Sequence, residues 1–166
     1  IVMQIPNRDS RLDDLERTPP VYRPRPGHAD LAGSIKWLTT DCRETLERAS
    51  ARETAARTAA GALARCLLRD FEIEAFGFVR SLLDVTTDVA VTEEDLEGLI
   101  AAREASEVYC PDEAASAQMI DRIRQAKVDK DTVGGLAEVH VFGCPIGLGT
   151  CVQHDLKLDG RLAGVV

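Results

Sequence analysis

The stretch of sequence that decides the fold is SARETAARTAAGALARCLLR, residues 50–69. Ser50 and Glu53 have the spacing of a capping box, in which a hydroxyl and a carboxylate accept hydrogen bonds from backbone N–H groups at a helix start. Small and apolar residues then recur every four positions, at Ala51, Ala55, Ala59, Leu63 and Leu67. A stripe that is mostly alanine lets another element approach the helix backbone closely, so the sequence predicts a buried central helix in a layered fold.

Patterns typical of strands and helices alternate on both sides of this helix. Upstream, a strand is predicted at residues 1–6, a long proline-containing loop at 7–27, and one or two short helices at 29–47, with apolar residues at Leu31, Ile35 and Leu38. Downstream, the predicted elements are a strand at 71–85, a helix at 92–104 capped by Thr92, a helix at 111–127 beginning with Pro111, and a strand within 131–149. The spacing is not that of a doubly wound fold, so we predict an α+β layered fold.

The composition is typical of a globular domain, with 45% hydrophobic residues among 166 and no apolar run near the roughly 20 residues of a membrane span. The five cysteines are scattered and include no Cys-x-x-Cys pair. This spacing predicts reduced thiols in the cytosol and neither a disulfide framework nor a zinc site. Carboxylate pairs with metal spacing are also absent from the sequence, and no basic run interleaved with aromatic residues suggests nucleic acid.

The net charge of −8 is unevenly distributed along the chain. Residues 1–70 hold 12 Lys and Arg against 10 Asp and Glu, whereas residues 71–166 hold 8 against 18. An anionic ligand would therefore favour the first half. The acidic second half is equally explained as a solvated surface that keeps the protein in solution.

A first candidate site lies at the start of the central helix, in the run from Arg48 through Ala49 and Ser50 to Arg52. Helix N-termini present free N–H groups and a partial positive charge, and two arginines flank this one, so phosphate is the expected ligand. The alternative is that the helix is merely capped here while the arginines form surface ion pairs with Glu44, Glu47 or Glu53.

A second candidate site is the run Arg25-Pro-Gly-His-Ala-Asp30. His28 ends a loop stiffened by proline and can transfer protons near neutral pH, because an unperturbed histidine has a pKa of about 6.5. The alternative is that His28 caps the following helix or bonds a backbone carbonyl. His140 and His154 have no partner pattern and are interpreted as structural or solvent-facing.

Several motifs, in one order along the chain, resemble those of the chorismate synthase family. They are the run Arg25–Asp30, the run Glu47–Arg57, and then Cys110-Pro-Asp112, Asp131–Gly135, Glu138-Val139 and Gly147-Leu-Gly149. The resemblance implies a carbon–oxygen lyase of the shikimate pathway and aromatic amino-acid biosynthesis. Its reaction would be an anti 1,4-elimination of phosphate from 5-enolpyruvylshikimate 3-phosphate, giving chorismate and requiring reduced FMN.

The resemblance also implies roles for individual residues. Arg48, Ala49 and Ser50 match the FMN-contacting segment, and Arg25, Ser50 and Arg52 match substrate contacts. His28 matches one of two catalytic histidines. The implied fold is a layered β-α-β sandwich assembled as a homotetramer in the cytoplasm, with NADPH as a candidate reductant. The sequence leaves open whether such an enzyme reduces its own flavin or uses an external reductase.

Two parts of the family pattern have no match in residues 1–166. These are the opening Gly-Glu-Ser-His-Gly segment, which carries the other catalytic histidine, and the later flavin-binding motifs. We therefore expect the central part of a single chorismate synthase domain, residues 1–166, with an incomplete fold and no activity by itself. The rival hypothesis is a non-catalytic phosphate-binding or assembly module that keeps only the anion site at the helix start.

Overall fold

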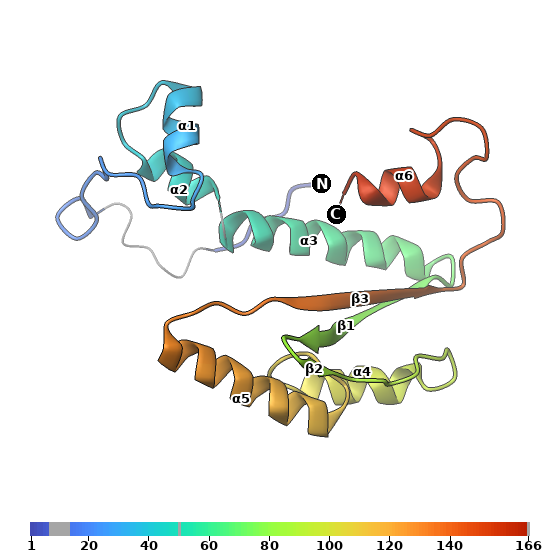
Figure 1. The fold of residues 1–166 in the computed structure, drawn as a ribbon. Coiled ribbons are helices and arrows are strands. Elements are labelled where there is room, and N and C mark those ends of the chain that lie inside the picture. The colour runs from blue at the N-terminus through green and yellow to red at the C-terminus, as the bar shows by residue number, and fades with distance from the viewer. Residues whose placement is uncertain (7–13, 50, 166) are drawn as a thin grey trace. The chain divides into compact units, whose positions relative to one another are not determined.

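The computed structural model describes residues 1–6, 14–49 and 51–165. The chain forms two compact units, Ile1–Cys66 and Leu67–Val166. Helices α1 to α3 begin in the first unit, and a three-stranded sheet with further helices forms the second (Figure 1).

The first unit contains α1 (Asp30–Trp37), α2 (Arg43–Arg48) and the greater part of α3 (Ala51–Arg69). One or two short helices were predicted at residues 29–47, and the structure has two. They pack closely at Gly33, where an added Cβ would lie 2.3 Å from the side chain of Thr45. Leu38 ends α1 in the left-handed conformation, with φ of 54°, and turns the chain towards α2.

One sequence prediction for this unit is wrong. Residues 1–6 form no strand, because a strand needs a hydrogen-bonding partner and none of the described residues pairs with them. Leu31, Ile35 and Leu38 lie on the exposed side of the α1 segment, with 57%, 66% and 91% of their surfaces accessible. The buried residues of α1 are Asp30 and Gly33, since close helix packing and an ion pair occupy the inner side.

Helix α3 has the predicted extent, but none of its described residues is buried. Ala55 and Ala59 are half-buried in a hollow that Ile5 also lines, while Leu63 and Leu67 are 41% and 60% exposed. The prediction of a buried central helix is therefore not met among the described residues, because they cover the stripe only in part. The predicted capping box includes Ser50, which lies outside the described residues.

In the second unit, β1 (Glu74–Leu82), β2 (Val85–Thr86) and β3 (Gly135–Phe142) form an antiparallel sheet in the order β2-β1-β3. The register pairs Phe76 with His140 and Phe78 with Glu138. At Gly135 a Cβ would lie 2.5 Å from the carbonyl oxygen of Ser81. Glycine is therefore required where β3 begins beside β1.

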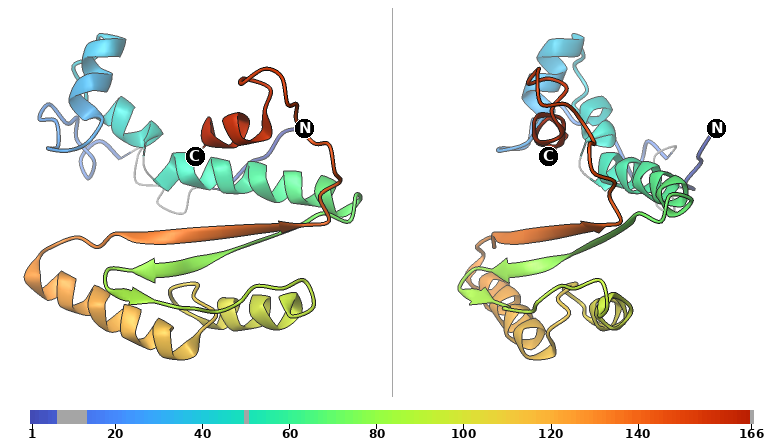
Figure 2. Two further views of the ribbon diagram at one scale, coloured as in Figure 1. Left: turned by 45° about the vertical axis from the view of Figure 1, so that its right-hand side comes forward. Right: turned by 90° about the vertical axis from the view of Figure 1, so that its right-hand side faces the viewer.

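Helices α4 (Leu96–Ala105) and α5 (Glu113–Asp129) lie on the same side of this sheet, as Figures 1 and 2 show, and α6 (Leu158–Ala163) follows β3. Arg103 of α4 covers the ring of Phe76, with its guanidinium carbon 5.2 Å from the ring centroid. The core cluster is formed by Val85, Cys110, Ala115 and Met119.

The downstream elements confirm the α+β prediction, with two local corrections. Helix α4 begins at Leu96 instead of Thr92; the Thr92 hydroxyl donates to the carboxylate of Asp95, the N-cap residue, at 2.7 Å. Helix α5 is capped by Asp112, which accepts from the backbone N–H of Ala115 at 3.1 Å, so Pro111 precedes the cap. In the described part of the chain, no helix is long and apolar enough to cross a membrane.

Candidate functional site

The turn from Arg25 to Asp30 is closed by one carboxylate. Asp30 Oδ2 accepts from the backbone N–H of Arg25 at 3.0 Å and from Arg25 Nε at 2.8 Å, and Oδ1 accepts from Nη2 at 3.0 Å. Asp30 is fully buried, whereas 39% of the Arg25 side chain is exposed. The hydrogen bonds from Arg25 lower the pKa of Asp30 to about 2, so the carboxylate is charged at neutral pH.

His28 is exposed at the tip of this turn, which Gly27 permits with a φ of 72°. His28 Nδ1 lies 3.0 Å from the carbonyl oxygen of Pro26. A carbonyl can only accept, so Nδ1 carries the hydrogen and the neutral ring has its lone pair on Nε2. The predicted alternative, a bond to a backbone carbonyl, is thus confirmed, and it leaves Nε2 available for proton transfer.

The loop that leads into the turn is anchored at Asp41. Its Oδ1 accepts from the backbone N–H groups of Val21 and Arg43, each at 2.9 Å. The N–H of Cys42 donates to the carbonyl of Val21 at 2.8 Å. The N–H hydrogen bonds hold the pKa of Asp41 below its usual range. Residues 21–30 are therefore held at both ends by buried or half-buried carboxylates.

The other predicted site residues lie around the junction of α2 and α3. Arg48 is exposed at the end of α2 and has no ion-pair partner among the described residues. Ala49 follows it as the C-cap, and Ser50 lies outside the described residues. Arg52 is paired with Glu47, with Nη2 2.6 Å from Oε2. For Arg52 the predicted alternative of an ion pair is confirmed.

Arg52 also borders a hollow of about 630 Å³ beside the first turns of α3. Apart from Arg52, its lining is mostly apolar: Met3, Ile5, Pro6, Ala51, Ala55, Ala56 and Ala59. The first unit thus holds Arg25 and His28 on one turn, and Arg48 and Arg52 at a helix junction. No contact between these two groups is found in the described part of the unit.

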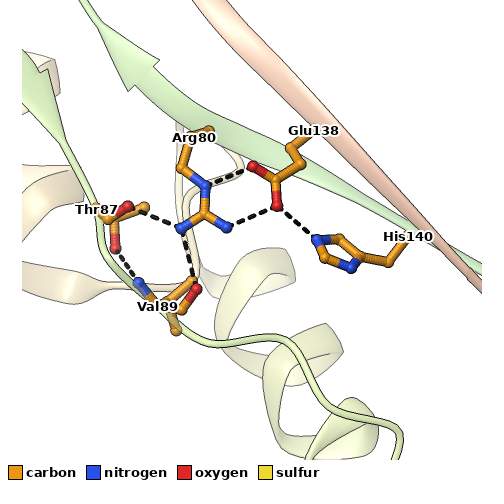
Figure 3. Close-up of polar contacts among 5 residues, drawn as sticks. All are labelled: Arg80, Thr87, Val89, Glu138 and His140. Carbon is orange, nitrogen blue, oxygen red and sulfur yellow. Dashed lines mark hydrogen bonds and ion pairs between the residues drawn. The ribbon is translucent and has the colours of Figure 1, made fainter.

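The sequence did not predict a polar network centred on Arg80 in the second unit (Figure 3). Arg80 donates from Nε and Nη2 to the two carboxylate oxygens of Glu138, at 2.7 and 2.6 Å, and from Nη1 to the carbonyls of Thr87 and Val89, at 2.8 and 3.0 Å. His140 Nε2 lies 2.5 Å from Glu138 Oε1. The hydrogen bonds from Arg80 and then His140 lower the pKa of Glu138 to about 2.

This network links four separate parts of the second unit. It joins β1 to β3 and to the segment that follows β2, and the buried Thr87 hydroxyl continues it by donating to Asp112 at the α5 cap, at 2.9 Å. His140 is therefore structural, as predicted, while His154 is exposed in a turn. Glu138 was part of a quoted motif, but nothing in the sequence indicated Arg80 as its partner.

The described residues contain no cluster of His, Cys, Asp and Glu that could hold a metal ion. All five cysteines are free thiols: Cys42 and Cys110 are buried, and Cys66, Cys144 and Cys151 are exposed.

Comparison with known proteins gives one consistent result. A family model described as "Chorismate synthase" matches residues 1–166. The chain belongs to the chorismate synthase family. It is 48% identical to the chorismate synthase of Desulforamulus reducens over 175 residues, covering 100% of this chain and 45% of that protein. It is 53% identical to the chorismate synthase of Symbiobacterium thermophilum over 144 residues, covering 87% and 37%.

The fold agrees with this membership. A solved structure titled "Crystal Structure of Chorismate Synthase" superposes with a TM-score of 0.70 and 36% identity, over 81% of this chain and 42% of that chain. The predicted α+β fold of the chorismate synthase type is thus confirmed, and it is incomplete here. The chain spans less than half the length of these relatives.

Proposed function

We propose that the chain is the central part of a chorismate synthase. Its reaction would be the anti 1,4-elimination of phosphate from 5-enolpyruvylshikimate 3-phosphate, with reduced FMN as cofactor. Family membership over all 166 residues supports this proposal. The observation that carries it is the turn from Arg25 to Asp30, in which His28 is exposed and the Arg25 guanidinium is held in place by Asp30.

The arginines of the first unit would bind the anionic groups of the substrate. A guanidinium matches the geometry of phosphate or carboxylate with two parallel hydrogen bonds. Arg25 is half-buried and ordered by Asp30, so it loses little side-chain freedom on binding. Arg52 is paired with Glu47 and would bind an anion either alongside that pair or by exchanging Glu47 for the ligand.

His28 would hold and transfer a proton at Nε2. The carbonyl of Pro26 fixes the hydrogen on Nδ1, so the ring has one defined basic nitrogen. An imidazole with one nitrogen that can accept a proton is suited to general acid–base chemistry. Because His28 is exposed in the turn, this nitrogen is accessible to a ligand.

The residues also fit the anionic parts of FMN. Arg48 has no ion-pair partner in the described chain, and Arg48, Ala49 and Ser50 would form the segment that contacts the cofactor. The apolar hollow beside Arg52 provides the type of surface that a planar ring needs on one side. When bound, reduced FMN would lend electron density to the substrate transiently, without net oxidation or reduction.

We further propose a homotetramer in the cytoplasm for the complete enzyme, with NADPH or an external reductase as the source of electrons for the flavin. The test of the proposed function is direct. The complete protein is incubated anaerobically with reduced FMN and 5-enolpyruvylshikimate 3-phosphate, and chorismate and phosphate are measured together. Equal amounts of the two products support the proposal; binding of the phosphorylated substrate without any product would favour the non-catalytic module.

A further inference from the structure

The buried carboxylate of Asp30 is paired with a single residue. All three of its hydrogen bonds come from one residue, Arg25, through the backbone N–H and two guanidinium nitrogens. The carboxylate is fully buried although its partner is half-exposed. A buried carboxylate is tolerated only when it is paired and hydrogen-bonded, so this arrangement depends on Arg25 remaining in one orientation.

The guanidinium nitrogens that Asp30 binds determine which nitrogens of Arg25 are left for a ligand. A guanidinium has two edges that can bind a carboxylate or phosphate with two parallel bonds: the Nε–Nη2 edge and the Nη1–Nη2 edge. Asp30 occupies the Nε–Nη2 edge. Nη1 has no partner among the residues that the structure describes, so the second edge is free.

We propose that Asp30 is a positioning residue, which fixes Arg25 so that its Nη1–Nη2 edge binds an anionic group of the substrate. The inference rests on the proposed function and identifies the residue that prepares its site. The same turn holds His28 against the Pro26 carbonyl, so the free guanidinium edge and Nε2 of His28 are presented from one six-residue segment.

If the Asp30 carboxylate is removed, this proposal and a purely electrostatic role for Arg25 predict opposite changes in substrate affinity. The ion pair with Asp30 offsets the positive charge of Arg25. If Arg25 attracted the substrate only as a charge, removing the carboxylate would strengthen the binding of an anion. If orientation is what matters, removing the carboxylate weakens binding, because the freed side chain must be ordered again by the ligand.

The test uses Asp30→Asn in the complete protein. Affinity for 5-enolpyruvylshikimate 3-phosphate is measured by calorimetry without flavin, and KM and kcat are measured with reduced FMN. We expect affinity to fall by about tenfold or more, the effect typical of losing an ordered charged hydrogen bond. KM should rise with little change in kcat, since the interaction is made equally in the ground and transition states.

The matched control is Asp84→Asn. Asp84 makes the same two-bond contact with Arg122, through Nε and Nη2, each at 2.7 Å, but it lies in the second unit and on the surface. The Asp84→Asn variant should bind the substrate with the same affinity as the wild type. A melting curve for each variant separates lost binding from lost folding.

A second variant decides the question if Asp30→Asn does not fold. Arg25→Lys keeps the positive charge beside Asp30 but lacks the planar guanidinium with its paired donors. Its affinity for the substrate should therefore also fall by about tenfold. Wild-type affinity in a folded Arg25→Lys protein, or unchanged or tighter binding by Asp30→Asn, refutes the inference alone. A wild-type protein that does not bind the substrate refutes the proposed function together with it.

Discussion

Replacing Arg80 with methionine should destabilise the second unit. Methionine has a similar unbranched stem but no donors. The substitution leaves Glu138 without its cation and the carbonyls of Thr87 and Val89 without their donor, and all three partners belong to segments that Arg80 holds together. The variant therefore tests whether this network maintains the pairing of β1 with β3.

The structure sets the size of the effect. Arg80 makes four hydrogen bonds at 2.6–3.0 Å, and only 17% of its side chain is exposed. Breaking a fully buried ion pair by removing one partner costs about 3–5 kcal/mol, and partial exposure reduces this cost. We expect about 2–4 kcal/mol of local stability to be lost, which corresponds to roughly 30-fold to 1000-fold faster amide exchange in the paired strands.

Hydrogen exchange of peptides from β1 and β3, followed by mass spectrometry in the complete protein, measures this loss. Arg122→Met is the matched control, because Arg122 makes a two-bond pair with Asp84 that is 50% and 63% exposed, and exposed pairs contribute little. Wild-type exchange in both strands of Arg80→Met would refute the structural role assigned to the network.

Three further predictions follow from the same geometry. His28→Asn keeps a donor for the Pro26 carbonyl but has no group at Nε2, so turnover should fall by about 10²- to 10⁴-fold with FMN affinity nearly unchanged; unchanged turnover would show that His28 is structural. The pKa of Glu138 is lowered from its usual 4.5 to about 2, so its contribution to stability is complete above about pH 4.5 and is lost as pH falls towards 2. Protection of β3 should decline over that range in the wild type and change less in Arg80→Met. Residues 1–166 alone should form no chorismate and bind FMN weakly, because one helix start cannot enclose the flavin ring; submicromolar binding with catalytic chorismate formation would contradict this.

Local signals in the sequence predicted much of the fold. The helix predicted at residues 111–127 is present as α5, Glu113–Asp129, and the short helices before residue 50 lie where their apolar spacing placed them. The same spacing did not indicate which side of α1 is buried, because Gly33 and the ion pair of Asp30 decide it. Periodicity detects a helix but cannot identify which of its faces will find a partner.

The candidate site was predictable only in part. Arg25 and His28 lie within one short motif, so their proximity followed from the sequence. The role of Asp30 did not, since it depends on which guanidinium edge the carboxylate occupies. Arg80 and Glu138 are separated by 58 residues, and the pairing requires the β1–β3 register, which no local pattern specifies.

The proposal that these residues form the middle of a chorismate synthase is tested most directly by placing them in a full-length, active relative. Residues 1–166 replace the matching segment of a full-length relative, and the chimera is expressed in cells that lack chorismate synthase and therefore require aromatic amino acids. We expect growth without those amino acids for the chimera, and no growth for the chimera carrying His28→Asn. A folded, soluble chimera that binds reduced FMN but makes no chorismate would contradict the proposal.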